Sequence, residues 1–305
     1  MVFLRSDSFR RSVDAIQWKY VAEEGWPTEW FNTRWPHILE PEHEDLNLPP
    51  SAMYALSNWQ ECHLSQLFPW HYWHGIRSSR NLHSSQVLCL TLFGAFGRER
   101  LQFLEKALRD AGLLDTGEVI LESEFEYEPE NYFNEKENRR TSVDFAVRIG
   151  RKGQPGTRVY FEIKFLESGF GQCSRGHSGQ CSGFPGLSVR DIPFHCLLTA
   201  EGISYWSKLP TLMDSGTCRV SCPVRGPFYQ LMRNVLHLVE EGGRAFVVLS
   251  DTRAKYLDSE VLNFVRFLAP PYRKLVHQMA FQHISPYLRL ADAAAATLLA
   301  RKYGI

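Results

Sequence analysis

The sequence predicts an α/β fold in which a mixed sheet is flanked by helices. Three segments in the middle of the chain alternate apolar and polar residues at every second position, which is the period of a strand with two different faces. Segments with helical spacing precede and follow them, and a short apolar run at 244–251 suits a strand buried on both faces. The predicted order is therefore helix, three strands, helix and strand, with additions at both ends.

The composition is that of a large globular chain with balanced charge. Its 305 residues permit one elaborated domain or two smaller ones, and we expect one core with additions. The 34 basic residues are matched by 34 acidic ones, so nucleic-acid binding would have to come from a local positive patch. The seven cysteines are an odd number scattered along the chain, which favours thiols in a reducing compartment over a disulfide framework.

No apolar run reaches the roughly 18 residues that a membrane span needs. The first residues also lack the charged-then-apolar layout of a secretory signal. We therefore expect a soluble, cytoplasmic protein with no membrane partner.

Residues 1–83 form a distinct section that holds seven of the eight tryptophans. Such residues could stack on bases or recognise a protein partner, but large aromatic side chains more often fill a core, and we expect that role here. Five prolines predict short helices and loops in this section: Pro27, Pro36, Pro41, Pro49 and Pro50.

Two helices are predicted next. Ser84 or Ser85 can cap the first, whose apolar residues run to Gly94. The second spans Glu99 to Asp110 and has an apolar stripe on one side.

The three strands are predicted at Glu118–Glu128, Ser142–Ile149 and Arg158–Phe165, with a hairpin between the last two. The following region, residues 167–225, is rich in Gly, Ser and Cys and too long for an ordinary connection. We expect an insertion that works as a lid or binding loop, or that packs separately.

A helix is predicted from Gly226-Pro227 to Gly242-Gly243, followed by the buried strand at 244–251. Three helices are predicted within residues 259–302, separated at Pro270-Pro271 and at Pro286. The predicted organisation is an N-terminal extension (1–83) packed on a core (84–251, with the insertion at about 167–225), and a helical C-terminal extension (252–305).

The spacing of three charged residues on the second and third strands is the strongest functional signal. Side chains in a strand alternate between faces, so Asp144 lies opposite to the apolar face of its strand. By the same rule Glu162 and Lys164 share one face of theirs. If the two strands pair, the three side chains can converge on one patch.

This grouping suits phosphodiester hydrolysis. Two carboxylates can hold Mg²⁺, which prefers oxygen ligands and keeps several waters. The metal would polarise the phosphate and lower the pKa of a bound water, while an ammonium group orients that water or offsets developing charge. The alternative is a solvated sheet face with ordinary cross-strand pairs.

Asp144, followed eighteen positions later by Glu162-Ile163-Lys164, resembles the D…(D/E)xK signature of the PD-(D/E)xK, or restriction-endonuclease-like, nuclease superfamily. The predicted order of elements from Ser84 to Asp251 is similar to that superfamily's common core. The resemblance implies that Asp144, Glu162 and the Ile163 carbonyl bind Mg²⁺ or Mn²⁺ and that Lys164 serves the attacking water. Val143 stands where the signature has proline.

The superfamily commonly adds an upstream acid. Glu122, Glu124 and Glu126 share one parity in the first strand, and Glu99 precedes them. We expect Glu124 or Glu126 to approach the metal and take Glu124 as the candidate ligand, although three acids on one face could equally be exposed.

Three further positions are candidates for supporting roles. Gln230 lies on a polar helical stripe, beside Tyr229, and resembles a helix glutamine that some members place near the active site. Arg233 on the same stripe could contact a phosphate or could be solvated. Ser85 and Gln86 at the helix start could bind phosphate through free backbone N–H groups, or the serines could be a plain cap.

Cys173, Cys181, Cys218 and Cys222 lie in or beside the insertion. Some nucleases of this superfamily stabilise such a region with an iron–sulfur cluster, but the spacing here lacks the CxxC pairs of zinc sites. We therefore expect ordinary thiols rather than an iron–sulfur cluster or zinc.

The predicted function is a metal-dependent DNA endonuclease in restriction, defence or repair, with RNA as an open alternative substrate. The chain could also form a homodimer. The main rival is a catalytically inactive nuclease-like fold that binds nucleic acid, or a protein partner through the N-terminal extension; a polar-faced α/β protein without phosphate chemistry is a further alternative. No GK[ST] phosphate loop, GxSxG elbow or HExxH motif is present.

Overall fold

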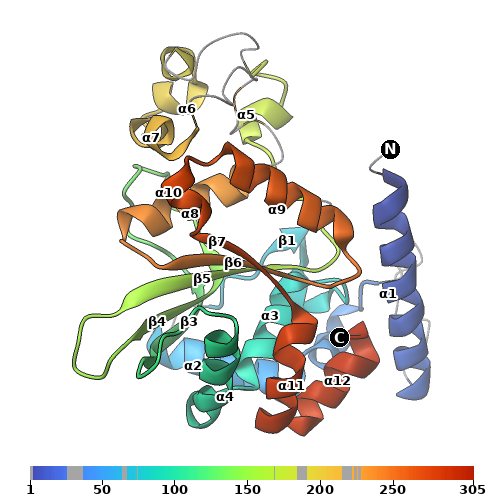
Figure 1. Cartoon of the computed structure of the whole chain (residues 1–305). Helices are drawn as coiled ribbons and strands as arrows, with labels where there is room; N and C mark the ends of the chain where they lie inside the picture. Colours follow the sequence, from blue (N-terminus) through green and yellow to red (C-terminus); the bar gives the residue numbers. More distant parts are fainter. Residues whose placement is uncertain are drawn as a thin grey trace.

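The computed structural model describes residues 3–25, 37–63, 67–73, 75–167, 169–183, 191–214 and 228–305, together with Cys222 and Arg225. Its centre is a five-stranded mixed sheet with the order β3-β4-β5-β6-β7 (Figure 1). The strands β3, β4 and β5 pair antiparallel, and β6 and β7 add parallel to β5. The strands span Val119–Tyr127 (β3), Val143–Gly150 (β4), Thr157–Lys164 (β5), Ala245–Ser250 (β6) and Val276–Ala280 (β7).

Helices cover both faces of this sheet (Figure 1). One face carries α3 (Ser85–Gly94), α4 (Leu101–Asp110), α11 (Phe281–Ala291) and α12 (Ala293–Tyr303); the other carries α8 (Tyr229–Glu240), α9 (Lys255–Phe267) and α10 (Pro270–Arg273). The predicted helices at 84–94 and 99–110, the four predicted strands and the helix before β6 are all present within a few residues of their expected ends. Gly226 and Pro227, the expected start of α8, lie outside the described residues.

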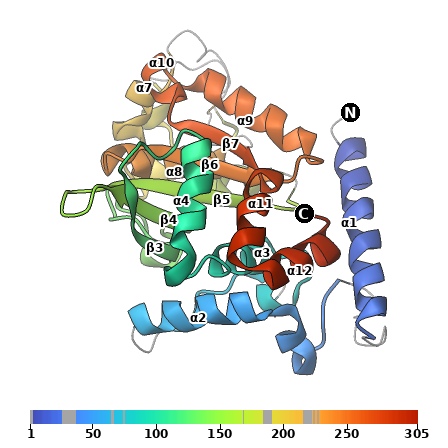
Figure 2. The same ribbon diagram turned by 60° about the horizontal axis from the view of Figure 1, so that its bottom comes forward.

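The helix α3 is buried on all sides because α2 (Pro50–Cys62) covers its outer surface, as Figure 2 shows from below. On its inner side Phe93 stacks on Phe145 of β4, with ring centroids 4.0 Å apart. On its outer side a Cβ at Gly94 would lie 2.2 Å from the Ser51 carbonyl oxygen. Only glycine permits this close approach of the two helices, so α2 packs directly on the outer side of α3.

The N-terminal section differs from the short helices expected there. It begins with a long helix, α1 (Phe3–Glu23), which lies beside α12 in both views (Figures 1 and 2). Trp59 is 6% exposed and fills a core, whereas Trp18 is 38% exposed. Trp26, Trp30 and Trp35 lie outside the described residues. The section also holds a two-stranded hairpin, β1 (Tyr72–Trp73) with β2 (Ile76–Arg77), and two 3-10 helices, η2 (Pro41–Asn47) and η3 (Ser78–Arg80).

The expectation of three helices at 259–302 was wrong in two respects. Val276–Ala280 forms β7, a strand whose residues are mostly half-buried and lack regular alternation, so no period marked it in the sequence. Pro286 lies inside α11 without ending it. The break comes at Asp292, whose carboxylate accepts a hydrogen bond of 3.0 Å from the Ala295 N–H and caps α12.

The described parts of the long insertion form short helices that pack onto the main core. Ile192, Trp206 and Leu209 are buried in the same cluster as the sheet residues, so these parts do not pack separately. The short helices are α5 (Ser174–His177), η6 (Ile192–Phe194), α6 (Leu197–Ala200), η7 (Tyr205–Ser207) and α7 (Leu209–Leu212); two other 3-10 helices, η4 (Arg98–Arg100) and η5 (Glu137–Arg139), flank β3. Within the described ranges, no helix is both long and apolar enough to cross a membrane.

Candidate active site

The strands β4 and β5 separate at the position of Asp144. Their ladder ends at the pair Phe145 and Phe161. Beyond that pair the Asp144 carboxylate accepts a hydrogen bond of 2.6 Å from the backbone N–H of Ile163. The thiol of Cys89 in α3 donates to the Asp144 carbonyl oxygen at 3.5 Å. The Asp144 side chain thus replaces a backbone carbonyl of β4 as the acceptor for the Ile163 N–H. This hydrogen bond holds a buried carboxylate at the fork where β4 and β5 separate.

Glu162 and Lys164 form a buried ion pair on β5. The Lys164 Nζ lies 3.0 Å from Glu162 Oε1, and the two side chains are 7% and 2% exposed, respectively. Parity along the strand predicted that they would share a face, and they do. Both side chains turn toward α8.

Gln230 of α8 contacts both members of this pair. Its Nε2 donates to Glu162 Oε1 at 2.6 Å, and its Oε1 accepts a hydrogen bond of 2.8 Å from Lys164 Nζ. One helical turn later Asn234 Nδ2 donates to Glu162 Oε2 at 3.0 Å. Gln230 was predicted near this site. Asn234 was expected on the same polar stripe but was given no role there, although its spacing of four residues from Gln230 places both amides on the same helix face.

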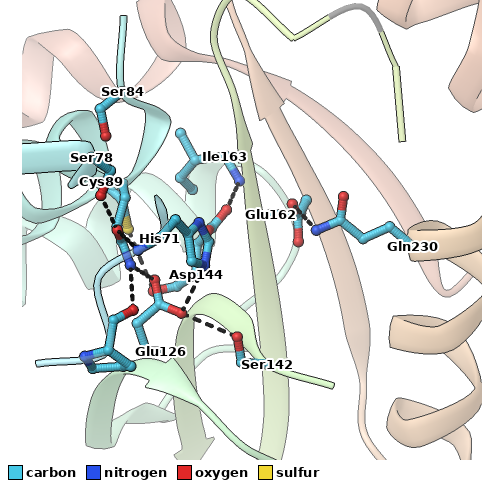
Figure 3. A network of polar contacts seen from close by, with 12 residues as sticks. His71, Ser78, Ser84, Cys89, Glu126, Ser142, Asp144, Glu162, Ile163 and Gln230 are labelled. Atoms are coloured by element: carbon cyan, nitrogen blue, oxygen red, sulfur yellow. Dashed lines mark hydrogen bonds and ion pairs between the residues drawn. The ribbon is translucent and has the colours of Figure 1, made fainter. Parts of the chain in front are cut away.

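The acid nearest to Asp144 on β3 is Glu126. It lies between the register pairs Phe125–Phe145 and Tyr127–Val143, opposite Asp144. It is 6% exposed, and its carboxylate accepts hydrogen bonds from Gln86 Nε2 at 2.5 Å and from Ser142 Oγ at 3.1 Å. Figure 3 shows Glu126 and Asp144 on the α3 side of β5, whereas Glu162 points to Gln230 on the other side.

The candidate Glu124 is placed elsewhere. It faces Ala146 in the ladder, and its carboxylate lies 3.6 Å from His63 Nε2. Glu122 pairs with Arg148, and Glu99 is exposed on η4. A register shift between Ile120 and Glu122 and the positive φ of Glu126 (47°) interrupt the simple alternation from which Glu124 was chosen.

The carboxylates of the site repel one another. Burial, together with the charges of Glu162 and Glu126, raises the pKa of Asp144 well above its usual value. Burial also raises the pKa of Glu126. Burial lowers the pKa of Lys164, but the charges of Glu162, Glu167 and Asp144 outweigh it, and the net shift is upward. Lys164 therefore stays protonated at neutral pH.

This donor set is chemically suited to a divalent cation. Mg²⁺ is commonly bound by one or two carboxylates and several waters, and Asp144 and Glu162 are buried oxygen donors on either side of the Ile163 backbone. Within the described residues, no group of three or more His, Cys, Asp or Glu side chains is placed to hold a metal ion as it stands. The Glu162 carboxylate is bound to the α8 amides instead, so it would have to exchange those partners for a metal.

The residues predicted to contact substrate have protein partners. Both polar ends of Gln86 are engaged, because its Nε2 donates to Glu126 and to the Pro69 carbonyl, and its Oε1 accepts from Ser78 Oγ and the His71 N–H. Arg233 donates to Glu135 and to the Arg139 carbonyl, at 3.2 and 2.9 Å. Gln86 therefore supports the carboxylate of Glu126, and Arg233 belongs to a separate buried ion pair.

The start of α3 and the cysteines complete the predicted positions. Ser84 caps α3 by accepting a hydrogen bond of 3.1 Å from the Val87 N–H, and Ser85 lines a cavity beside it. Cys173 and Cys222 are buried and Cys181 is half-buried. Cys218 lies outside the described residues, so the expectation of ordinary thiols stays a prediction.

Comparison with known proteins identifies a family for the chain. The model of a family described as restriction endonuclease associating with ARP matches residues 18–304. Searches of the curated proteins and of the solved structures find no match. The match covers every residue of the candidate site.

Proposed function

Because the chain belongs to the family of restriction endonucleases associating with ARP, we propose that it is a metal-dependent nuclease that hydrolyses phosphodiester bonds in DNA. The observation that carries this proposal is the fork between β4 and β5. There the Asp144 carboxylate, held by the Ile163 N–H, lies across β5 from the buried ion pair of Glu162 and Lys164.

Asp144 and Glu162, with the carbonyl of Ile163, are the residues that would hold Mg²⁺ or Mn²⁺. When bound, the cation would polarise the phosphate and lower the pKa of a coordinated water. Glu126 takes the place of Glu124 as the upstream acid in this proposal, because it lies opposite Asp144 on the neighbouring strand.

Lys164 acts as a charged group and not as a general base. Its pKa is raised by the surrounding carboxylates, so it carries no free electron pair with which to accept a proton at neutral pH. It would orient the attacking water or offset the negative charge that develops on the phosphate. Gln230 fixes the positions of the Lys164 and Glu162 side chains relative to each other, and Asn234 donates a hydrogen bond to the second carboxylate oxygen of Glu162.

The biological setting we propose is restriction or another defence role. The family's description names an association with ARP, and we propose that the chain works with such a protein partner through residues 1–83. We also propose that residues 84–251 form the catalytic core, with β7 from the C-terminal section completing its sheet.

The experiment is incubation of the purified full chain with plasmid DNA, linear DNA and single-stranded RNA, each with Mg²⁺, Mn²⁺ or EDTA. Cutting of DNA with either metal and none with EDTA is the expected result. Cutting of RNA but not of DNA would show that the substrate is RNA. Folded protein that binds DNA but cuts neither polymer, with or without the ARP partner, would favour the binding-module alternative.

A further inference from the structure

A cavity of about 720 Å³ adjoins the candidate active site and has no role in the proposed hydrolysis. It lies between α1, the β1–β2 hairpin and the start of α3, and Glu167, three residues beyond Lys164, also lines it. Gln86 lines it as well and contacts Glu126 on its other side. Its volume falls in the range of about 300–1,000 Å³ that is typical of pockets for small ligands.

His83 lies in the wall of this cavity. The residue is 9% exposed, and its Nε2 lies 2.7 Å from the Asp14 carboxylate. Its ring stacks on His37 with the centroids 4.3 Å apart. Among the described residues, the other ring nitrogen, Nδ1, has no hydrogen-bond partner. The ring is thus held by Asp14 and His37 at the wall of the cavity, with Nδ1 buried behind it.

The start of α3 and Arg10 add groups that favour an anion. The first amides of a helix have no intrahelical acceptor, and Ser84 caps only the Val87 N–H. Arg10 is exposed and lines the same cavity. Two acids also line it, but Asp14 is paired with His83 and the Glu167 carboxylate accepts a hydrogen bond of 2.7 Å from the Phe165 N–H.

Two aromatic side chains line the cavity with large exposed surfaces. Trp18 is 38% exposed and Tyr72 is 63% exposed, in contrast to the buried Trp59. Aromatic rings beside a basic groove are the usual platform for stacking the bases of single-stranded nucleic acid. A flat apolar surface and an anion-binding group in one cavity match the two halves of a nucleotide.

We propose that this cavity binds one nucleotide unit of a nucleic-acid strand, with its phosphate at Arg10 and the start of α3 and its base against Trp18 or Tyr72. This assignment rests on the proposed nuclease function, because it makes the cavity a holding site for the strand that enters the neighbouring centre. It also gives a reason why Trp18 stays exposed on a helix outside the sheet.

The test is equilibrium binding of a 3′-labelled single-stranded 12-nucleotide DNA to the full chain in EDTA, measured by fluorescence anisotropy. Trp18→Ala is expected to weaken binding about tenfold, since stacking on one aromatic ring commonly contributes that much. Arg10→Ala is expected to weaken binding and to lower the salt dependence by about one phosphate contact. Arg11→Ala is the matched control, because Arg11 is the next residue of α1 and is exposed outside the cavity.

Binding by Trp18→Ala and Arg10→Ala equal to that of the wild type would overturn the assignment, and so would wild-type protein that binds no oligonucleotide. If a free nucleoside 5′-monophosphate competes as tightly as the oligonucleotide, the cavity binds a free nucleotide and not a nucleotide unit of a nucleic-acid strand. EDTA prevents metal-dependent cleavage in this binding assay. The nuclease proposal is therefore tested separately, by the cleavage experiment with Mg²⁺ or Mn²⁺. A wild-type chain that cuts DNA while both variants bind and cut normally would refute the cavity assignment alone.

Discussion

Gln230 binds Glu162 and Lys164 at the same time, donating to the carboxylate at 2.6 Å and accepting from the ammonium group at 2.8 Å. One amide from α8 therefore sets the relative orientation of the two charged groups on β5. This contact joins the helix that follows the insertion to the fork between β4 and β5. It makes α8 part of the candidate site and not only a cover for the sheet.

Gln230→Ala should lower kcat for DNA cleavage by about 10–100-fold and change KM little, because Gln230 positions charged groups without needing to contact the substrate. Steady-state cleavage kinetics measure this split. The matched control is Glu240→Gln on the same helix, where Glu240 pairs with Lys208 away from the site. A rise in KM alone would assign Gln230 to substrate binding instead.

Glu126→Gln should reduce cleavage strongly, whereas Glu124→Gln should leave it within about twofold of the wild type. Glu126 is buried opposite Asp144, but Glu124 is placed beside His63. The measurement is the initial rate of plasmid nicking at saturating Mg²⁺, and a loss on about the 10²-fold scale is expected for a charged group of the centre. The reverse order of the two variants would restore Glu124 as the upstream acid.

Mg²⁺ should raise the melting temperature of the wild type but not that of Asp144→Asn. A hundredfold excess of metal over its Kd stabilises the native state by about 2.7 kcal/mol. Without metal, the raised pKa of Asp144 means that the native state binds more protons than the unfolded state, so its contribution to stability falls as pH rises above the unfolded pKa. Asp144→Asn should therefore be more stable than the wild type in EDTA at pH 7. Calorimetry that finds equal Mg²⁺ responses would argue against Asp144 as a ligand.

Lys302 should make stability depend on pH in the alkaline range. It is 2% exposed, it donates to the Asn47 side chain at 2.5 Å, and burial lowers its pKa to about 7. Between pH 7 and about 10.4 the unfolded state then binds more protons, so stability should rise with pH through this range. Lys302→Met should remove that rise, as followed by urea unfolding at pH 7 and pH 9. An unchanged pH slope in the variant would show that Lys302 is not its source.

Much of the fold could be predicted because each strand from β3 to β6 has a clear signature. The first three alternate apolar and polar residues over much of their length, and Ala245–Ser250 is buried throughout because both faces are covered. The strand β7 could not be predicted, since His277 and Gln278 interrupt any period and the pairing with β6 decides its conformation. The helix break predicted at Pro286 was wrong for a related reason. Ile284 and Leu288 pack in the core on either side of the proline, and α11 stays continuous through it.

In the site, strand parity alone placed Glu162 beside Lys164. It could not choose between Glu124 and Glu126, because a register shift and a positive φ are tertiary features without a sequence signature. Strand parity also could not show that Arg233 forms an ion pair with Glu135. Glu135 belongs to the charged loop 129–140, which lies far from Arg233 in the sequence. Long-range partners of this kind become visible only once the chain is folded.

Cleavage of supercoiled plasmid DNA by the wild type, Asp144→Asn and Lys164→Met in Mg²⁺ tests whether Asp144 and Lys164 form a catalytic centre, and circular dichroism establishes that each variant is folded. Glu122→Gln, an exposed acid on β3, is the control. We expect cutting by the wild type and the control, and rates lower by about 10²–10³-fold or more in both site variants. Cutting at the wild-type rate by folded Asp144→Asn or Lys164→Met would show that the substituted residue is not part of the catalytic centre.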